Sequence, residues 1–272
     1  MFFVTKLTKR WCYILDTEDW VIERVHRNVA KSVKGIYGAT LKCGKNGEMQ
    51  ICSNREMVEE QLVHLRLYSK AEIDVYCGMM LRQYKSQEES IRLPYGLTSI
   101  GVYTFKSCRE TLKRIVIPDT VIEIGEGAFS RCRRLSEVSL PNAIHTISKN
   151  LFYQCGLKHI DLPASVKRIG RCAFFMTALE AIELPCNLQV VGADAFSMCY
   201  RLQSVILPES IKIIEDGAFS DCPFLEKIVI PSKGVTFGVN VFGHSANVVI
   251  YTVAGSTAVT YAAKHKIPVI YI

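Results

Sequence analysis

A phenylalanine recurs at a nearly constant interval through most of the second two thirds of the chain. Its seven positions are 22 to 24 residues apart: Phe105, Phe129, Phe152, Phe174, Phe196, Phe219 and Phe242. Leucine or isoleucine followed by proline keeps the same interval, from residues 93–94 to residues 230–231. A repeat of this length is typical of a solenoid, in which each unit buries its apolar groups against its neighbours.

One repeat, residues 207–231, shows how the pattern fills a turn. Ile228 and Ile230 alternate within a short predicted strand and should face inward, and proline follows where a missing N–H harms a ladder least. Ile211 and Ile214 mark a second extended segment. The Gly-Ala-Phe sequence at 217–219 then predicts a turn that carries the ring of Phe219 into the interior.

Small side chains occupy a further column of the repeat. It holds five cysteines, one threonine and one serine: Cys108, Cys132, Cys155, Cys199, Cys222, Thr177 and Ser245. This exchange predicts a slot for a small side chain with a weak donor, and hence a ladder of buried thiols. A metal site is disfavoured, because no C-x-x-C pair exists and successive ligands would lie along a stack. Disulfides between neighbouring turns stay open, although the odd total of eleven cysteines favours a reducing compartment.

Residues 124–141 follow the motif I-G-x-x-A-F-x-x-C-x-x-L-x-x-I-x-L-P, with Val138 in the position of the second isoleucine. The other units follow the same motif less strictly. It resembles the BspA-type leucine-rich-repeat family of bacterial surface proteins. The resemblance covers more than half of the chain and implies the solenoid fold. It also implies surface exposure and adhesion to host proteins or to other cells.

The sequence predicts three parts. Residues 1–90 form a small α+β N-terminal domain, residues 91–245 a predominantly β leucine-rich-repeat solenoid of about seven repeats, and residues 246–272 a small C-terminal cap. The cap should consist of a strand at 248–253, a helix at 257–266 with Ser256 as its N-cap, and a strand at 269–272. The N-terminal domain either covers the first repeat or binds a partner independently.

Several elements are predicted within residues 1–90. They are a strand at 2–7, hairpins at 12–25 and 39–52, a short helix at 28–33, and a helix from a Ser53/Glu56 capping box to about residue 68. Residues 71–84 continue as strand or helix. Residues 85–90 are the one polar stretch that resembles a linker, and it is short enough to keep the two parts in contact.

The outward positions of the predicted strands form a candidate partner-binding face, two per repeat. They are Arg114, Val116, Glu137, Ser139, His159, Asp161, Ala181, Glu183, Ser204, Ile206, Lys227 and Val229. Solenoids commonly bind partners through such extended faces. The alternative is a solvated sheet face with scattered apolar groups.

Charge is uneven along the repeats. Residues 93–171 carry twelve Lys or Arg and six Asp or Glu, whereas residues 172–230 carry three and eight. A candidate basic patch in the first half consists of Arg131, Arg133, Arg134, Lys167, Arg168 and Arg171. The asymmetry favours an electrostatic partner site or head-to-tail self-association. The sequence argues against nucleic acid as a partner, because the total net charge is only +7 and few aromatic residues are interleaved with the basic ones.

No pattern in the chain predicts catalysis, a cofactor or a metal. Phosphate-loop and H-E-x-x-H motifs are absent, and His159 and Asp161 share a strand face without a nucleophile. We therefore expect a non-catalytic, adhesin-like protein that binds a protein partner through the solenoid. The alternative is an intracellular scaffold or regulatory module whose N-terminal domain recognises the partner.

Localisation is predicted differently by the sequence and by the resemblance. No apolar run is long enough for a transmembrane helix, and the start of the chain lacks the apolar region of a secretory signal. The sequence as given therefore favours the cytoplasm. The resemblance favours the cell surface or secretion, with an export signal that this sequence does not include.

Overall fold

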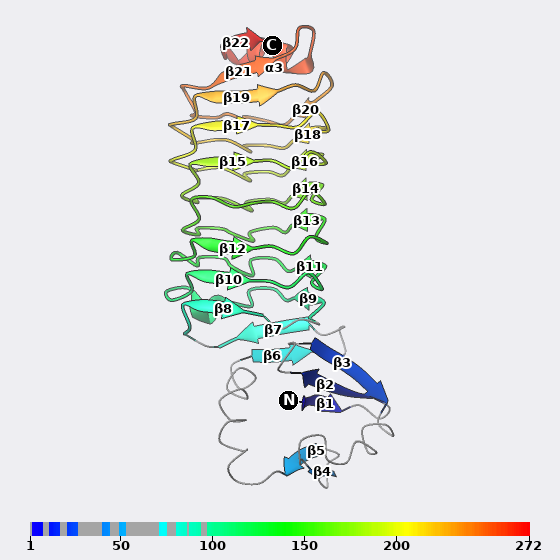
Figure 1. Cartoon of the computed structure of the whole chain (residues 1–272). Coiled ribbons are helices and arrows are strands. Elements are labelled where there is room, and N and C mark those ends of the chain that lie inside the picture. The colour runs from blue at the N-terminus through cyan, green and yellow to red at the C-terminus, as the bar shows by residue number, and fades with distance from the viewer. Residues whose placement is uncertain are drawn as a thin grey trace.

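A computed structural model describes the backbone of six strands between positions 2 and 74, and then residues 80–272 apart from positions 86 and 94–96. From residue 80 onward the chain winds into an elongated stack of turns (Figure 1). Most turns contribute one strand to each of two parallel ladders, as the repeat pattern predicted, and a further backbone ladder forms a third side.

The first side of the stack carries the longer strands. They are β8 (Ser90–Arg92), β10 (Arg114–Val116), β12 (Glu137–Ser139), β15 (Ala181–Glu183), β17 (Ser204–Ile206), β19 (Lys227–Ile230), β21 (Val249–Thr252) and β22 (Val269–Tyr271). Ile228 and Ile230 of β19 are buried and Lys227 is exposed, which confirms the predicted alternation.

The second side carries mostly two-residue strands. They are β7 (Met80–Tyr84), β9 (Ser99–Ile100), β11 (Glu123–Ile124), β13 (Thr146–Ile147), β14 (Arg168–Ile169), β16 (Val190–Val191), β18 (Ile213–Ile214) and β20 (Thr236–Phe237). Ile211 and Ile214 are buried here, as predicted.

The third side is a backbone ladder that the sequence predicted only as a turn. The N–H groups of Gly127, Phe129 and Arg131 donate to carbonyls of the next turn, with N···O distances of 3.0, 3.1 and 2.6 Å. Residues two before and two after most of the column phenylalanines have positive φ, for example Gly127 at 60° and Arg131 at 65°. In this left-handed conformation, alternate N–H groups point along the axis of the stack. Backbone hydrogen bonds of the third side therefore join successive turns, as those of the two sheets do.

The phenylalanine column is the centre of the core. Neighbouring rings from Phe105 to Phe242 are stacked with centroids 4.8 to 5.9 Å apart, within the range of favourable aromatic pairs. Tyr84 extends the column at one end, 5.6 Å from Phe105. Tyr261 of the terminal helix lies edge-on to Phe242 at the other end, at 6.1 Å. The predicted inward column is therefore confirmed and is closed by a tyrosine at each end.

Both sheet ladders are interrupted in the middle of the stack. The first side consists of a three-stranded sheet, β12-β10-β8, and a five-stranded sheet, β15-β17-β19-β21-β22. The interruption follows a corner that is one residue shorter than in the preceding unit, Cys155-Gly156-Leu157, where a Cβ on Gly156 would overlap the carbonyl oxygen of Arg133. On the second side, β11 and β13 belong to different sheets. The third-side ladder and the phenylalanine column continue through this region and hold the two halves together.

The described N-terminal strands agree with the predictions. β1 (Phe2–Leu7), β2 (Trp11–Asp16) and β3 (Val21–His26) form an antiparallel sheet, and β4 (Thr40–Cys43) pairs with β5 (Met49–Cys52). The described parts of residues 71–84 are two antiparallel strands, β6 (Ala71–Asp74) and β7. The helices predicted at 28–33 and 53–68 lie outside the described residues.

The parallel ladders include residues ahead of position 91. β7 pairs with β9, and β8 pairs with β10, so residues 80–84 and 90–92 already belong to the stack. The polar stretch 85–90 thus connects two strands that are both paired with the solenoid. The division of the chain into three domains stays a prediction.

The C-terminal strand, helix and strand are present as predicted: β21, α3 (Thr257–His265) and β22. Ser256 is the N-cap residue, as predicted, but its hydroxyl makes no capping hydrogen bond. The residue is buried, and its Oγ lies 2.9 Å from the hydroxyl of Thr252 instead. No helix in the described part of the chain is long and apolar enough to cross a membrane.

Candidate functional site

The predicted binding face points outward but is not one continuous sheet. Nine of its twelve residues are exposed, and Val116, Ser204 and Val229 are half-buried. Arg114 is in register with Glu137 and forms an ion pair with it at 3.2 Å. The four residues from Arg114 to Ser139 and the six from Ala181 to Val229 lie on separate sheets. His159 and Asp161 lie between these sheets in a segment that is not a strand.

A hollow opens on this face at the interruption of the ladder. Its volume is about 370 Å³, and it is lined by Arg114, Ile115, Val116, Ser136, Glu137, Val138, Ser139, His159, Ile160 and Asp161. No backbone hydrogen bond joins residues 137–140 to residues 159–162 in this described region. The backbone groups that would continue the ladder therefore face the hollow unpaired.

The hollow combines groups of both charges. Arg114 is paired with Glu137, whereas His159 and Asp161 are exposed and have no protein partner among the described residues. The sequence identified these side chains as outward-facing, but it did not predict that they surround a depression. The corner beside Gly156 is one residue shorter than the preceding one, but equal changes elsewhere leave the strands paired, so the sequence carries no clear signal for the hollow.

An apolar row runs along the other half of the same side. Ile206, Val229, Tyr251 and Ile270 are successive partners in the parallel register, and the Nζ of Lys227 lies 4.8 Å from the centroid of the Tyr251 ring. The alternation of the repeat predicted Ile206 and Val229 as outward-facing residues but did not extend to Tyr251 and Ile270. The phenylalanine repeat ends at Phe242, so the spacing alone could not assign their register.

The predicted basic patch is divided between two sides of the stack. Arg131 lies on the third side, and exposed Arg133 and Arg134 follow it at the corner. Lys167 and Arg168 lie at β14 on the second side. Arg168 and Arg171 each form an ion pair with a carboxylate. Arg168 is 2.8 Å from Glu215, and Arg171 is 3.8 Å from Asp194. The six residues therefore do not form a single surface of free positive charge.

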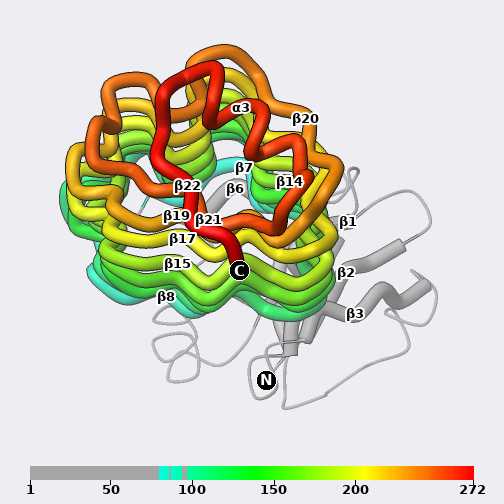
Figure 2. The backbone as a smooth tube through the Cα atoms, turned by 90° about the horizontal axis from the view of Figure 1, so that it is seen from above, coloured from blue at the N-terminus to red at the C-terminus, as the bar shows by residue number. Residues whose placement is uncertain are grey.

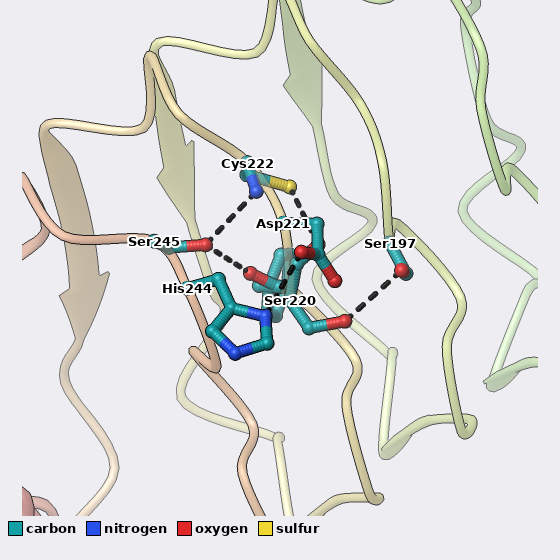
Figure 3. A network of polar contacts seen from close by, with 7 residues as sticks. Ser197, Ser220, Asp221, Cys222, His244 and Ser245 are labelled. Carbon is teal, nitrogen blue, oxygen red and sulfur yellow. Dashed lines mark hydrogen bonds and ion pairs between the residues drawn. The ribbon is translucent and has the colours of Figure 1, made fainter.

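The buried column of small side chains contacts backbone carbonyls. The Sγ atoms of Cys155, Cys199 and Cys222 donate to the phenylalanine carbonyl one turn earlier, at 2.9, 3.2 and 3.1 Å. Ser245 Oγ makes the same contact to Phe219 at 2.8 Å and also accepts the N–H of Cys222 (Figure 3). The predicted slot for a small donor is thus confirmed.

Burial makes these thiols poor nucleophiles. It raises the pKa of Cys199 to about 11 and of Cys222 to about 12, and it raises that of Cys155 well above its ordinary value. From position 80 onward the described cysteines are free thiols, and those of this column are buried. At neutral pH they act as structural hydrogen-bond donors.

An aspartate–histidine pair lies beside the last units of this column. His244 Nδ1 is 3.0 Å from Asp221 Oδ1, and the ring is exposed (Figure 3). The hydroxyl of Ser220 contacts Ser197 at 3.0 Å, and that of Ser245 is bound to backbone groups. No hydroxyl or thiol among the described residues contacts the imidazole, so the pair lacks a nucleophile. The same region contains no group of three or more His, Cys, Asp or Glu that could hold a metal ion.

Comparison with known proteins identifies the repeat. The family model described as BspA type leucine rich repeat region matches in six copies over residues 83–179 and 145–262, which together span more than half of the chain. A leucine-rich-repeat protein of T. pallidum is similar in structure, with 25% identity over 72% of this chain and 91% of that chain and a TM-score of 0.63. A leucine-rich-repeat protein from Bacteroides ovatus shares 21% identity over 80% of this chain and 70% of that chain, with a TM-score of 0.40. No curated protein sequence matches the chain.

Proposed function

Because this chain belongs to the BspA-type leucine-rich-repeat family, we propose that it is a non-catalytic binding protein whose partner is another protein. The observation that carries the proposal is the hollow of about 370 Å³ at the centre of the outward face. Protein-binding surfaces commonly place a few anchor side chains in such central depressions.

The composition of the hollow suits protein side chains. Arg114 and Glu137 neutralise each other, while His159 and Asp161 are free to pair with groups of a partner. Unpaired backbone groups beside Val138 and Ile160 offer further donors and acceptors. The surrounding surface is extended and rigid, because every turn is joined to the next by up to three ladders, and a rigid surface loses little entropy on binding.

In its finer form the proposal is an adhesin-like role, in which the partner is a protein of a host or of another cell. This part rests on the family resemblance.

The experiment compares two arginine substitutions of similar chemistry. Ser139→Arg places a long charged side chain in the hollow, whereas Thr236→Arg places one on β20 of the second side. Both positions are exposed, and neither side chain makes a hydrogen bond in the described structure. The intact wild-type protein and both variants are immobilised, exposed to extracts of candidate partner cells, and the retained proteins are quantified by mass spectrometry.

We expect a protein that is retained by the wild type and by Thr236→Arg but lost from Ser139→Arg. Equal retention by all three proteins would show that the hollow does not bind the partner. Equal loss from both variants, with unchanged thermal unfolding, would also contradict this assignment.

A further inference from the structure

The last strand of the first side, β22, has an open outer edge. It is the terminal strand of its sheet, at the end of the stack beside α3 (Figures 1 and 2). The carbonyl of Pro268 accepts from Ile250 at 2.9 Å, and the N–H of Ile272 donates to Thr252 at 3.2 Å, so these groups face β21. Because peptide groups alternate along a strand, the N–H and C=O groups of Val269 and Tyr271 face the opposite edge. No described strand pairs with them.

The edge lacks the usual protection against pairing. Proteins commonly guard an open edge with a charged residue, a proline or a bulge within the strand. β22 reads Val-Ile-Tyr and pairs with β21 in regular register. Ile270, Tyr271 and Ile272 are 46%, 62% and 60% exposed. This strand is therefore well suited to accept a further strand.

The residues that form this end of the stack include lysines but no acidic side chain. Residues 231–272 contain three lysines and two histidines but no aspartate or glutamate. Lys264, His265 and Lys266 are exposed and directly precede the segment that enters β22. A peptide segment that pairs with this edge would lie close to these lysines. The lysines would attract carboxylates of the peptide at short range.

This end charge also argues against a second copy of the chain as the occupant. Two such edges would bring two sets of lysines together. The N-terminal half of the repeats is basic as well, so head-to-tail contact between ends gains no charge complementarity.

We infer that the outer edge of β22 binds an extended, acidic peptide segment of a partner protein, which adds to the sheet as its next strand. The added strand pairs with the backbone groups of Val269 and Tyr271. Its side chains on one face continue the apolar row that ends at Ile270, and its carboxylates lie near Lys264 and Lys266. This site is separate from the hollow, and the inference does not depend on it.

The probe is a fluorescein-labelled synthetic peptide in which valine alternates with glutamate, and its anisotropy is measured with the intact protein. We expect saturable binding that weakens as salt is raised, because exposed charges are screened. A peptide of the same length with lysine in place of glutamate should bind at least about tenfold more weakly, since the difference of charge reverses every electrostatic contact. Failure of the glutamate peptide to bind, or equal binding of the two peptides, would overturn the inference.

Two substitutions at one position test the backbone pairing. Tyr271→Pro removes an N–H that faces the open edge and leaves the bonds to β21 in place, whereas Tyr271→Ala removes the same side chain but keeps the N–H. We expect the proline variant to bind about tenfold more weakly than the alanine variant, which corresponds to the loss of one hydrogen bond. Thermal unfolding of both variants checks that the sheet is intact. Equal affinities would overturn the inference, as would a wild-type dimer in light scattering that Tyr271→Pro abolishes.

Discussion

The Sγ atom of Cys155 lies 2.9 Å from the carbonyl oxygen of Phe129, one turn earlier in the stack. The same contact recurs between Cys222 and Phe196, and serine replaces cysteine in the contact between Ser245 and Phe219. The column thus links neighbouring turns by a side chain that must be small and must donate. This relationship explains why cysteine and serine exchange within it. Thr177 fills the same slot but donates to the carbonyl of Phe174 in its own turn, at 2.9 Å.

Removal of this donor should destabilise the protein more than its replacement by another donor. Cys155→Ala removes one of two donors to the buried carbonyl of Phe129, which keeps the N–H of Cys132, and we expect a loss of about 0.5–1.5 kcal/mol in the free energy of unfolding. Cys155→Ser keeps a donor, as Ser245 does in its own unit, and should be less destabilising. Urea unfolding followed by circular dichroism measures both. A serine variant as unstable as the alanine variant would show that packing, and not the hydrogen bond, determines the column.

The buried thiols should make stability fall at alkaline pH. Burial raises the pKa of Cys132 and Cys222 to about 12 and that of Cys199 to about 11, from 9.0. Above pH 9 the unfolded chain loses these protons and the folded chain keeps them, so the unfolded state binds fewer protons and the stability decreases as pH rises. The stabilising effect is complete below pH 9 and is lost as pH passes through the folded-state values. Unfolding midpoints across this range measure the slope, which Cys199→Ser should reduce; an unchanged slope would assign the pH dependence to other groups.

The middle of the aromatic column should be sensitive to truncation. Phe174 is fully buried between Phe152 and Phe196, with ring centroids at 5.4 and 5.1 Å. Phe174→Ala should lower the free energy of unfolding by about 3–5 kcal/mol, because the rigid turns cannot close the cavity. Phe224→Ala is the control, since Phe224 is 60% exposed and its truncation should change stability by less than about 0.5 kcal/mol. Equal urea midpoints for the two variants would contradict the assigned core.

The short corner at Gly156 should reject a methyl group. A Cβ at this position overlaps the carbonyl oxygen of Arg133, which is backbone and cannot rotate away. We expect Gly156→Ala to cost about 1–3 kcal/mol, as overpacking usually does. Gly234→Ala provides the comparison, because a Cβ there has no neighbour within 4 Å. Thermal unfolding of the two variants distinguishes them; a Gly156→Ala protein as stable as Gly234→Ala would indicate that the corner can move.

The sequence by itself determined the solenoid and its interior. The interval of Phe129, Phe152 and Phe174 fixes the repeat, and a repeat of this length can bury its apolar groups only by stacking. Alternation within each unit therefore predicted which strand residues face outward, from Arg114 to Val229. The strand, helix and strand of the C-terminal cap were also predicted, because their turn residues and periodicity are local signals.

Only the tertiary structure decided how these outward residues are grouped. Whether Glu137 and His159 continue one ladder depends on the relative position of two whole turns, and the apolar pattern of the repeats is the same whether or not their strands pair. The third-side ladder could not be predicted for a related reason. It depends on the left-handed conformation of residues such as Arg131 and Met198, and these residue types do not indicate that conformation. The open edge of β22 likewise follows from which strand pairs last. The residue types within each repeat determine which side chains are buried. Contacts between turns depend instead on backbone positions, whose small differences accumulate along the stack.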